Sequence, residues 1–174
     1  MKKSIIIWFT GMSGSGKSTL TQGLANHLRK LGQEVVIFDG DTIRERINKH
    51  LGFTKQCIID NNLSIIDLCK EGQFQYDYIL VAVISPFEQT RKEARRILGK
   101  DYYEVYVQAS LDQLIDRDKK GLYKKALSGN IENFIGIDPK VPYEVPAHPD
   151  LIIDTDQDSE LRSIQKIIDH FKTI

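Results

Sequence analysis

The chain has 174 residues, and its 24 basic and 24 acidic side chains give a formal net charge of zero at pH 7. This length fits one domain, 1–174, with a full hydrophobic core, and the balanced charge gives no indication of nucleic acid as a partner. Cys57 and Cys69 lack the paired spacing of zinc or redox sites, and no apolar stretch reaches membrane-spanning length. We therefore expect a cytoplasmic protein with reduced thiols and no membrane partner.

Strands and helices are expected to alternate along the chain. In chain order, the apolar patterns predict a strand at 4–10, a helix at 18–31, a strand at 34–38, helices at 42–49 and 58–70, a strand at 78–84, a helix at 87–98, a strand at 102–107, a helix at 111–118, a strand at 151–153 and a helix at 159–171. This order predicts an α/β domain of three layers, α/β/α, with a five-stranded parallel sheet.

A glycine-rich loop follows the first predicted strand directly. Glycines in such a loop let the backbone N–H groups surround phosphate oxygens, and the helix that follows adds its positive end. Lys17 would reach the β and γ phosphates, and the Ser18 hydroxyl would ligate Mg²⁺. We expect a P-loop kinase-type fold that binds ATP and Mg²⁺ through Gly11, Met12, Ser13, Gly14, Ser15, Gly16, Lys17, Ser18 and Thr19.

Polar residues follow the next two strands, where ligands of parallel sheets bind. Asp39 and Asp41 end the second strand, Arg44 follows one turn later, and Ile84 and Ser85 end the third. A carboxylate near a γ phosphate either accepts the proton of an attacking hydroxyl or holds Mg²⁺ through water. We assign the first role to Asp41. The alternative is that Asp39 and Asp41 only cap the following helix, as aspartate often does.

The segment 119–149 is predicted to form a lysine-rich lid. Five cations lie between Arg117 and Lys125, and aromatic residues follow them. A charge run is commonly just a solvated face, but a nearby triphosphate favours closure over phosphates. Phe53 and Phe134 fit no core periodicity, so we expect them to stack on a base rather than to pack in the core.

These motifs together resemble the adenylylsulfate kinases, which phosphorylate the ribose 3′-hydroxyl of adenosine 5′-phosphosulfate with MgATP. The likeness covers nearly the whole chain. It rests on the phosphate loop, Asp39-Gly40-Asp41 with Arg44, Gly52-Phe53, Asn61, Ile84-Ser85-Pro86 with Arg91, Lys120-Gly121-Leu122-Tyr123-Lys124-Lys125-Ala126, Phe134, Gly136-Ile137-Asp138 and Pro142-Tyr143-Glu144.

The resemblance implies a role for each matching residue. Asp41 and Lys17 would be catalytic, with Asp41 orienting or deprotonating the 3′-hydroxyl. Ser85 would lie near the transferred phosphoryl group, without an assigned covalent role. The acceptor nucleotide would be held by Asp39, Asp41, Arg44, Phe53, Asn61, Ile84, Ser85, Lys120 and Phe134. The family is often dimeric, which implies a homodimer.

The chain departs from the family where arginines are expected. Ile58 replaces one before Asn61, Leu63 and Ser64 stand where others are expected after it, and Leu127 replaces one in the lid. Losing an arginine from an anion contact costs roughly 1.5 to 3 kcal/mol, or about tenfold or more in affinity. The acceptor pocket is therefore expected to differ at its anionic end.

Three functions remain open. The favoured one is a nucleotide 3′-kinase acting on cytidine diphosphoramidate, since the sequence resembles the capsule-associated branch of the family. The second is an adenylylsulfate kinase of sulfate assimilation in which the changes are tolerated, and the third is a non-catalytic ATP-sensing module. Under the first hypothesis, Ile58→Arg would raise activity on adenosine phosphosulfate.

Overall fold

The sheet at the centre of the molecule has five parallel strands in the order β2-β3-β1-β4-β5. The computed structural model describes residues 3–171. The strands are β1 (Ile5–Thr10), β2 (Val35–Asp39), β3 (Tyr78–Ala82), β4 (Tyr102–Gln108) and β5 (Leu151–Asp154). Apolar residues run almost without interruption along β1 and β3 because both faces of the sheet are covered. The predicted five-stranded parallel sheet is confirmed.

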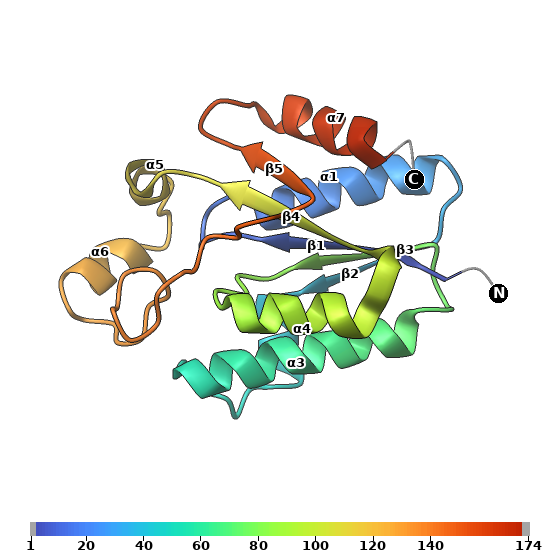
Figure 1. Ribbon diagram of the computed structural model, residues 1–174. Helices are drawn as coiled ribbons and strands as arrows, with labels where there is room; N and C mark the ends of the chain where they lie inside the picture. Colours follow the sequence, from blue (N-terminus) through green and yellow to red (C-terminus); the bar gives the residue numbers. More distant parts are fainter. Residues whose placement is uncertain (1–2, 172–174) are drawn as a thin grey trace.

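Helices cover both faces of the sheet, as Figure 1 shows: α1 and α7 on one face, α3 and α4 on the other. The helices are α1 (Lys17–Lys30), α2 (Gly40–Arg46), α3 (Lys55–Gly72), α4 (Glu88–Leu98), α5 (Leu111–Asp116), α6 (Leu122–Leu127) and α7 (Glu160–Phe171), with a 3₁₀ turn η1 (Gly99–Asp101). The short helix α6 and the loop after it lie beyond the carboxyl ends of the strands. This is the end at which the sequence predicts the ligand site.

The hydrophobic core has two halves, one on each side of the sheet. Ile7 and Phe9 pack with Leu24 of α1 and Ile167 of α7. On the other side, Trp8 packs with apolar residues of α3 and α4. Burial of this kind contributes about 25 cal/mol per Å² of apolar surface, so the two layers fix the strand ends in place.

Several element boundaries differ from those predicted. α3 begins at Lys55 rather than 58, because the Thr54 hydroxyl accepts a hydrogen bond from the Cys57 N–H and caps the helix. β3 ends at Ala82 rather than 84, because the chain then turns away and Ser85 adopts a left-handed φ of 38°. The helix α6 was not predicted.

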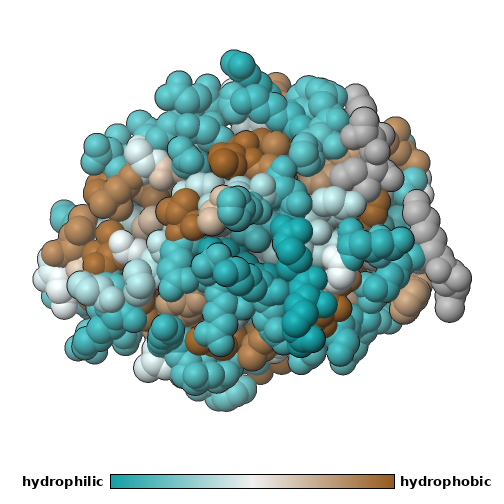
Figure 2. Space-filling model, in the orientation of Figure 1, coloured by the Kyte–Doolittle hydropathy of each residue, from teal (hydrophilic) through white to brown (hydrophobic). Residues whose placement is uncertain are grey.

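The face in Figure 2 is mostly hydrophilic, with apolar residues gathered in small separate groups. Within residues 3–171, none of the helices combines the length and hydrophobicity that crossing a bilayer requires.

Candidate active site

A cavity of about 300 Å³ lies at the carboxyl ends of β1, β2 and β3. Its wall is formed by the phosphate loop, the starts of α1 and α2, the first half of α3, the chain after β3 and one residue of the 119–149 segment. The lining residues are Ser13, Gly14, Gly16, Lys17, Ser18, Thr19, Asp39, Gly40, Asp41, Arg44, Phe53, Ile58, Asn61, Asn62, Ala82, Val83, Ile84, Ser85, Pro86 and Ile135. Most of the predicted site residues therefore meet in one place.

Lys17 closes the phosphate loop on itself. Its Nζ donates to the carbonyl oxygens of Gly11, at 2.9 Å, and Met12, at 2.8 Å. Gly11 must be glycine, because a Cβ there would lie 2.4 Å from the carbonyl oxygen of Val107 on β4. Gly16 has a φ of 102° and precedes the first residue of α1. The loop thus presents a lysine and a helix N-terminus to an anion.

Burial of Lys17 disfavours its protonated, charged form. Burial lowers the pKa of Lys17 from 10.5 to about 8, although Asp41 and Asp39 act in the opposite direction. The side chain is only 8% exposed. A polyphosphate bound beside Lys17 would supply negative charge and so raise the pKa of the lysine again.

Asp39 and Asp41 have different environments. Asp39 caps α2 by accepting hydrogen bonds from the Asp41 and Thr42 N–H groups, and its Oδ2 accepts from the Ser18 hydroxyl at 2.8 Å. The Asp41 carboxylate is exposed and forms no hydrogen bond or ion pair within residues 3–171, although its charge acts on Lys17. Capping is therefore done by Asp39, and Asp41 is available for chemistry.

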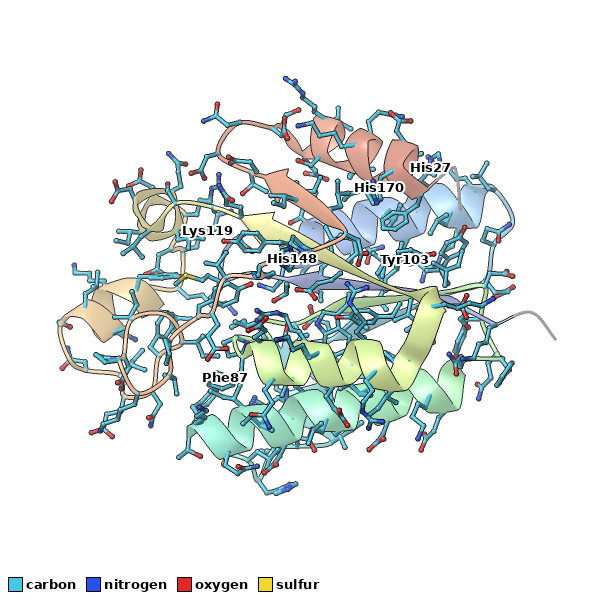
Figure 3. The ribbon with its side chains drawn as sticks, viewed as in Figure 1. His27, Phe87, Tyr103, Lys119, His148 and His170 are labelled. Carbon is cyan, nitrogen blue, oxygen red and sulfur yellow. The ribbon has the colours of Figure 1, made fainter. Side chains whose placement is uncertain are left out.

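Ser18 and Asp39 form a set of oxygen donors that suits Mg²⁺, a hard cation with a preference for oxygen ligands. Among the described residues, no group of three or more histidine, cysteine or acidic side chains is arranged to hold a metal ion. Such a site would be completed by phosphate oxygens and water, as is usual for Mg²⁺ with a nucleotide. Three of the four histidines, His27, His148 and His170, lie on different segments of the chain, as Figure 3 shows.

The wall of the cavity also contains Arg44, Phe53 and Asn61, three of the residues that the resemblance assigns to the acceptor. The Arg44 guanidinium lies 4.7 Å from the centre of the Phe53 ring and donates to the carbonyl oxygens of Leu51 and Gly52. Phe53 is 56% exposed, so its ring has a free surface for stacking. The Asn61 Oδ1 accepts a hydrogen bond from Asn48, which orients its carboxamide.

Ser85 is held in a buried hydrogen-bond network. Its hydroxyl accepts from the Trp8 indole at 3.0 Å and donates to Thr10 Oγ1 at 2.9 Å. Thr10 in turn contacts the hydroxyl of Tyr143 at 3.0 Å. The strained turn at Ser85 therefore links β1, the end of β3 and the 119–149 segment, and it fixes Ile84 at the cavity wall.

Two predicted acceptor residues do not reach the cavity wall. Phe134 packs edge-on against Tyr123, with ring centres 4.9 Å apart, while its neighbour Ile135 lines the cavity. Lys120 is exposed to solvent. The expected stacking of Phe53 and Phe134 around a base is thus not formed in this structure, because Phe134 is engaged by Tyr123.

Arg91, one of the residues that carry the family resemblance, has a structural position. It is 2% exposed and lies outside the cavity wall. It donates to the carbonyl oxygens of Ser85 and Glu144 and pairs with Glu104 at 3.1 Å. Arg91 therefore joins the end of β3 to the 119–149 segment.

Comparison with known proteins identifies the family. The adenylylsulphate kinase family profile matches residues 3–154. An adenylyl-sulfate kinase of Clostridium kluyveri is 41% identical over 168 residues, which cover 97% of this chain and 83% of the relative. The chain belongs to the adenylylsulfate kinase family. An adenylyl-sulfate kinase of Oceanobacillus iheyensis is 44% identical, covering 98% of this chain and 85% of the relative.

Solved structures agree with this membership. The Mycobacterium tuberculosis APS kinase CysC, in complex with AMPPNP and APS, superposes with a TM-score of 0.91 at 32% identity, covering 99% of each chain. The chain is accordingly an adenylylsulfate-kinase-like phosphotransferase with an alcohol group as acceptor, from a family that uses ATP. Each of the two relatives described above is named for adenylyl sulfate, so these names do not support the capsule-associated branch as the nearest group.

Sequence reasoning missed part of the cavity wall. Asn62, Val83 and Ile135 line the cavity, but none belongs to a local motif. For Asn62 a signal was available, since a polar residue beside Asn61 falls on the same turn of α3. For Ile135 the sequence holds no such signal, because its position depends on how the 119–149 segment packs.

Proposed function

We propose that this protein is an ATP-dependent kinase that phosphorylates the ribose 3′-hydroxyl of a nucleotide acceptor, with adenylyl sulfate as the acceptor that its relatives' names support best. One observation carries the proposal: the exposed Asp41 carboxylate, which forms no hydrogen bond or ion pair within residues 3–171, shares a cavity with Lys17. Asp41 would accept the hydroxyl proton, and Lys17 with the loop N–H groups would stabilise charge on the transferring phosphoryl group. Bound Mg²⁺, held by Ser18 with Asp39 nearby, would neutralise phosphate charge.

The non-catalytic ATP-sensing alternative is disfavoured by the same geometry. A sensor needs the phosphate loop but has no use for a carboxylate kept free of capping, or for Arg44 and Phe53 on the acceptor side. The partner that we propose is accordingly a small nucleotide. A homodimer remains a prediction that light scattering would check.

A second acceptor, cytidine diphosphoramidate, is favoured by the wall at Ile58. Ile58 is 3% exposed and packs with Phe87 and Val141 in a small apolar cluster, where the family resemblance leads us to expect an arginine. In Figure 3, Phe87 lies at the start of α4, on the side of the 119–149 segment. The two acceptors carry the same formal charge at neutral pH, but the terminal phosphoramidate has an NH2 group in place of one sulfate oxygen, so it needs one hydrogen-bond donor fewer from this wall.

The test is phosphoryl transfer from MgATP to adenylyl sulfate and to cytidine diphosphoramidate, measured side by side, with the product position fixed by phosphorus NMR. We expect a 3′-phosphorylated product from one of the two. Preference for adenylyl sulfate supports the first acceptor, preference for the cytidine compound supports the second, and no turnover of either refutes the proposal.

The structure changes how the missing arginines should be tested. Ile58→Arg would place a charge inside an apolar cluster and is expected to destabilise the fold. Leu127 is 55% exposed on α6, so Leu127→Arg restores a family arginine without that cost. If charge limits acceptor binding, Leu127→Arg should lower the KM for adenylyl sulfate, whereas Leu127→Gln should not.

A further inference from the structure

Asn62 carries a buried hydrogen-bond donor without an acceptor. Asn62 is 1% exposed and lines the cavity, and its Nδ2 has no hydrogen-bond partner within residues 3–171. Buried polar groups are nearly always hydrogen-bonded, and an unmet donor destabilises the folded state. A group that lowers stability in the wall of an active-site cavity is a candidate for a ligand contact.

The neighbouring asparagines are paired, which sets Asn62 apart. Asn48 Nδ2 donates to Asn61 Oδ1 at 3.1 Å and to Ser64 Oγ at 2.6 Å. Polar partners are therefore available on this part of α3, and they engage Asn48 and Asn61. Asn62 lies on the turn of the helix that faces the cavity together with Ile58, four residues earlier.

The surroundings of Asn62 indicate the kind of atom that it would meet. Ile58 and Val83 contribute apolar surface to the same cavity, and the cations in its wall are Lys17 and Arg44. Ligand pockets commonly combine apolar walls with a few polar groups that fix orientation. The last torsion of asparagine is broad, so a rotation of the carboxamide turns Nδ2 toward the cavity at little cost.

We infer that Asn62 is a specificity-determining residue for the acceptor nucleotide, and that its side-chain N–H donates a hydrogen bond to an oxygen or ring nitrogen of that substrate. This inference rests on the proposed function, because it needs a nucleotide acceptor in the cavity. ATP is held on the other side, by the phosphate loop, so its binding does not depend on Asn62. The substrate atom that accepts this hydrogen bond belongs either to the nucleoside or to the anionic end of the acceptor.

The test replaces the carboxamide by an apolar group of the same branching. Asn62→Leu should raise the KM for the acceptor roughly 10- to 100-fold and leave the KM for ATP unchanged, since one hydrogen bond to the substrate is lost. The same variant should melt at a higher temperature than the parent, because an unpaired buried donor is removed. A residue with only a structural role would give the reverse pattern, a lower melting temperature and unchanged KM values.

Asn48→Leu is the matched control. It removes a buried asparagine whose Nδ2 has two partners, and it should melt at a lower temperature. Should Asn62→Leu not fold, Asn62→Ala removes the donor without adding volume and carries the same expectation for the acceptor KM. Competitive inhibition by the matching unphosphorylated nucleoside separates the two sources of the lone pair. Weaker inhibition of Asn62→Leu assigns the bond to the nucleoside, and unchanged inhibition assigns it to the anionic end.

Two failures can be told apart. If the parent protein turns over adenylyl sulfate or cytidine diphosphoramidate while the acceptor KM of Asn62→Leu is unchanged, the inference is wrong and the proposed function stands. If the parent turns over neither, the proposed function is wrong, and the inference falls with it.

Discussion

Lys17 is a phosphate-binding lysine whose charge is weakened by its own burial. Its pKa of about 8 in the folded protein lies below the ordinary value of 10.5, so this group adds stability as the pH rises from 8 toward 10.5, where only the unfolded chain still holds the proton. Bound phosphates act in the opposite direction and favour the protonated form. Nucleotide binding and proton uptake are therefore coupled at this residue.

We predict that ATP binding takes up a proton above pH 8 and that ATP affinity falls there, by at most tenfold per pH unit for one proton. Calorimetry in two buffers of different ionisation enthalpy measures this uptake. Lys17→Met should bind ATP weakly at every pH and abolish the uptake. An unchanged uptake in Lys17→Met would assign the proton to another group.

Asp41 is the residue on which catalysis is expected to depend. Asp41→Asn keeps the size of the side chain but cannot accept the hydroxyl proton, so we expect kcat to fall about 10²- to 10⁴-fold with little change in ATP affinity. Steady-state kinetics with saturating MgATP measure the loss. A large loss of ATP affinity instead would place Asp41 at the metal. Asp39→Ala should lower stability by about 1 kcal/mol, since it removes the cap of α2.

At this scale the motifs that are contiguous in sequence were predictable and the rest were not. The phosphate loop and Asp39-Gly40-Asp41 carry their chemistry in neighbouring residues, and the structure places both at one cavity. The engagement of Phe134 by Tyr123 and the lack of a partner at Asn62 arise from packing between distant segments. No local pattern encodes such contacts.

The helix α6 is the element that the sequence analysis did not predict. It spans only Leu122–Leu127, and it is fixed by Asp118, whose carboxylate accepts hydrogen bonds from three backbone N–H groups at the start of the helix. Short helices depend on such caps and on tertiary packing more than on their own propensity. Tyr123 supplies the packing, since its buried hydroxyl donates to the carbonyl oxygen of Ser13 in the phosphate loop at 2.7 Å.

This contact predicts coupling between α6 and the phosphate loop. Tyr123→Phe removes the hydrogen bond and leaves the Ser13 carbonyl without it, at a cost of about 1 kcal/mol. We expect faster amide hydrogen exchange in residues 122–127 together with a higher KM for ATP. Tyr76→Phe is the control and should change neither, because Tyr76 precedes β3 and so lies at the opposite end of the parallel strands from the phosphate loop. Faster amide exchange confined to α6, with an unchanged KM for ATP, would refute the coupling.

For the whole molecule, the segment 119–149 is predicted to close over bound substrates. It is attached at both ends, by Tyr123 to the phosphate loop and by Arg91 to Glu144, and its exposed lysines lie between and beside these points. Limited trypsin digestion should cut at Lys124 or Lys125, and MgATP with the acceptor should slow the cut severalfold. A cutting rate that substrates leave unchanged would contradict closure.

The overall architecture followed from the alternation of apolar strands with amphipathic helices, because parallel sheets need both faces covered. What the alternation does not encode is the path of a long irregular segment. The 119–149 segment contributes Ile135 to the cavity wall, and the chain turns directly after it at Gly136, whose φ of 82° favours glycine.

Trp8 is the one tryptophan of the chain, and it is 1% exposed with its indole N–H bonded to Ser85. Ser85 also forms part of the cavity wall. One hydrogen bond therefore connects the single tryptophan, an intrinsic fluorophore, to the site where substrates are expected. Its emission should be blue-shifted, as in any dry indole, and should respond when an occupant moves the turn at Ser85. The protein thus carries its own optical reporter, and ligand titrations need no label.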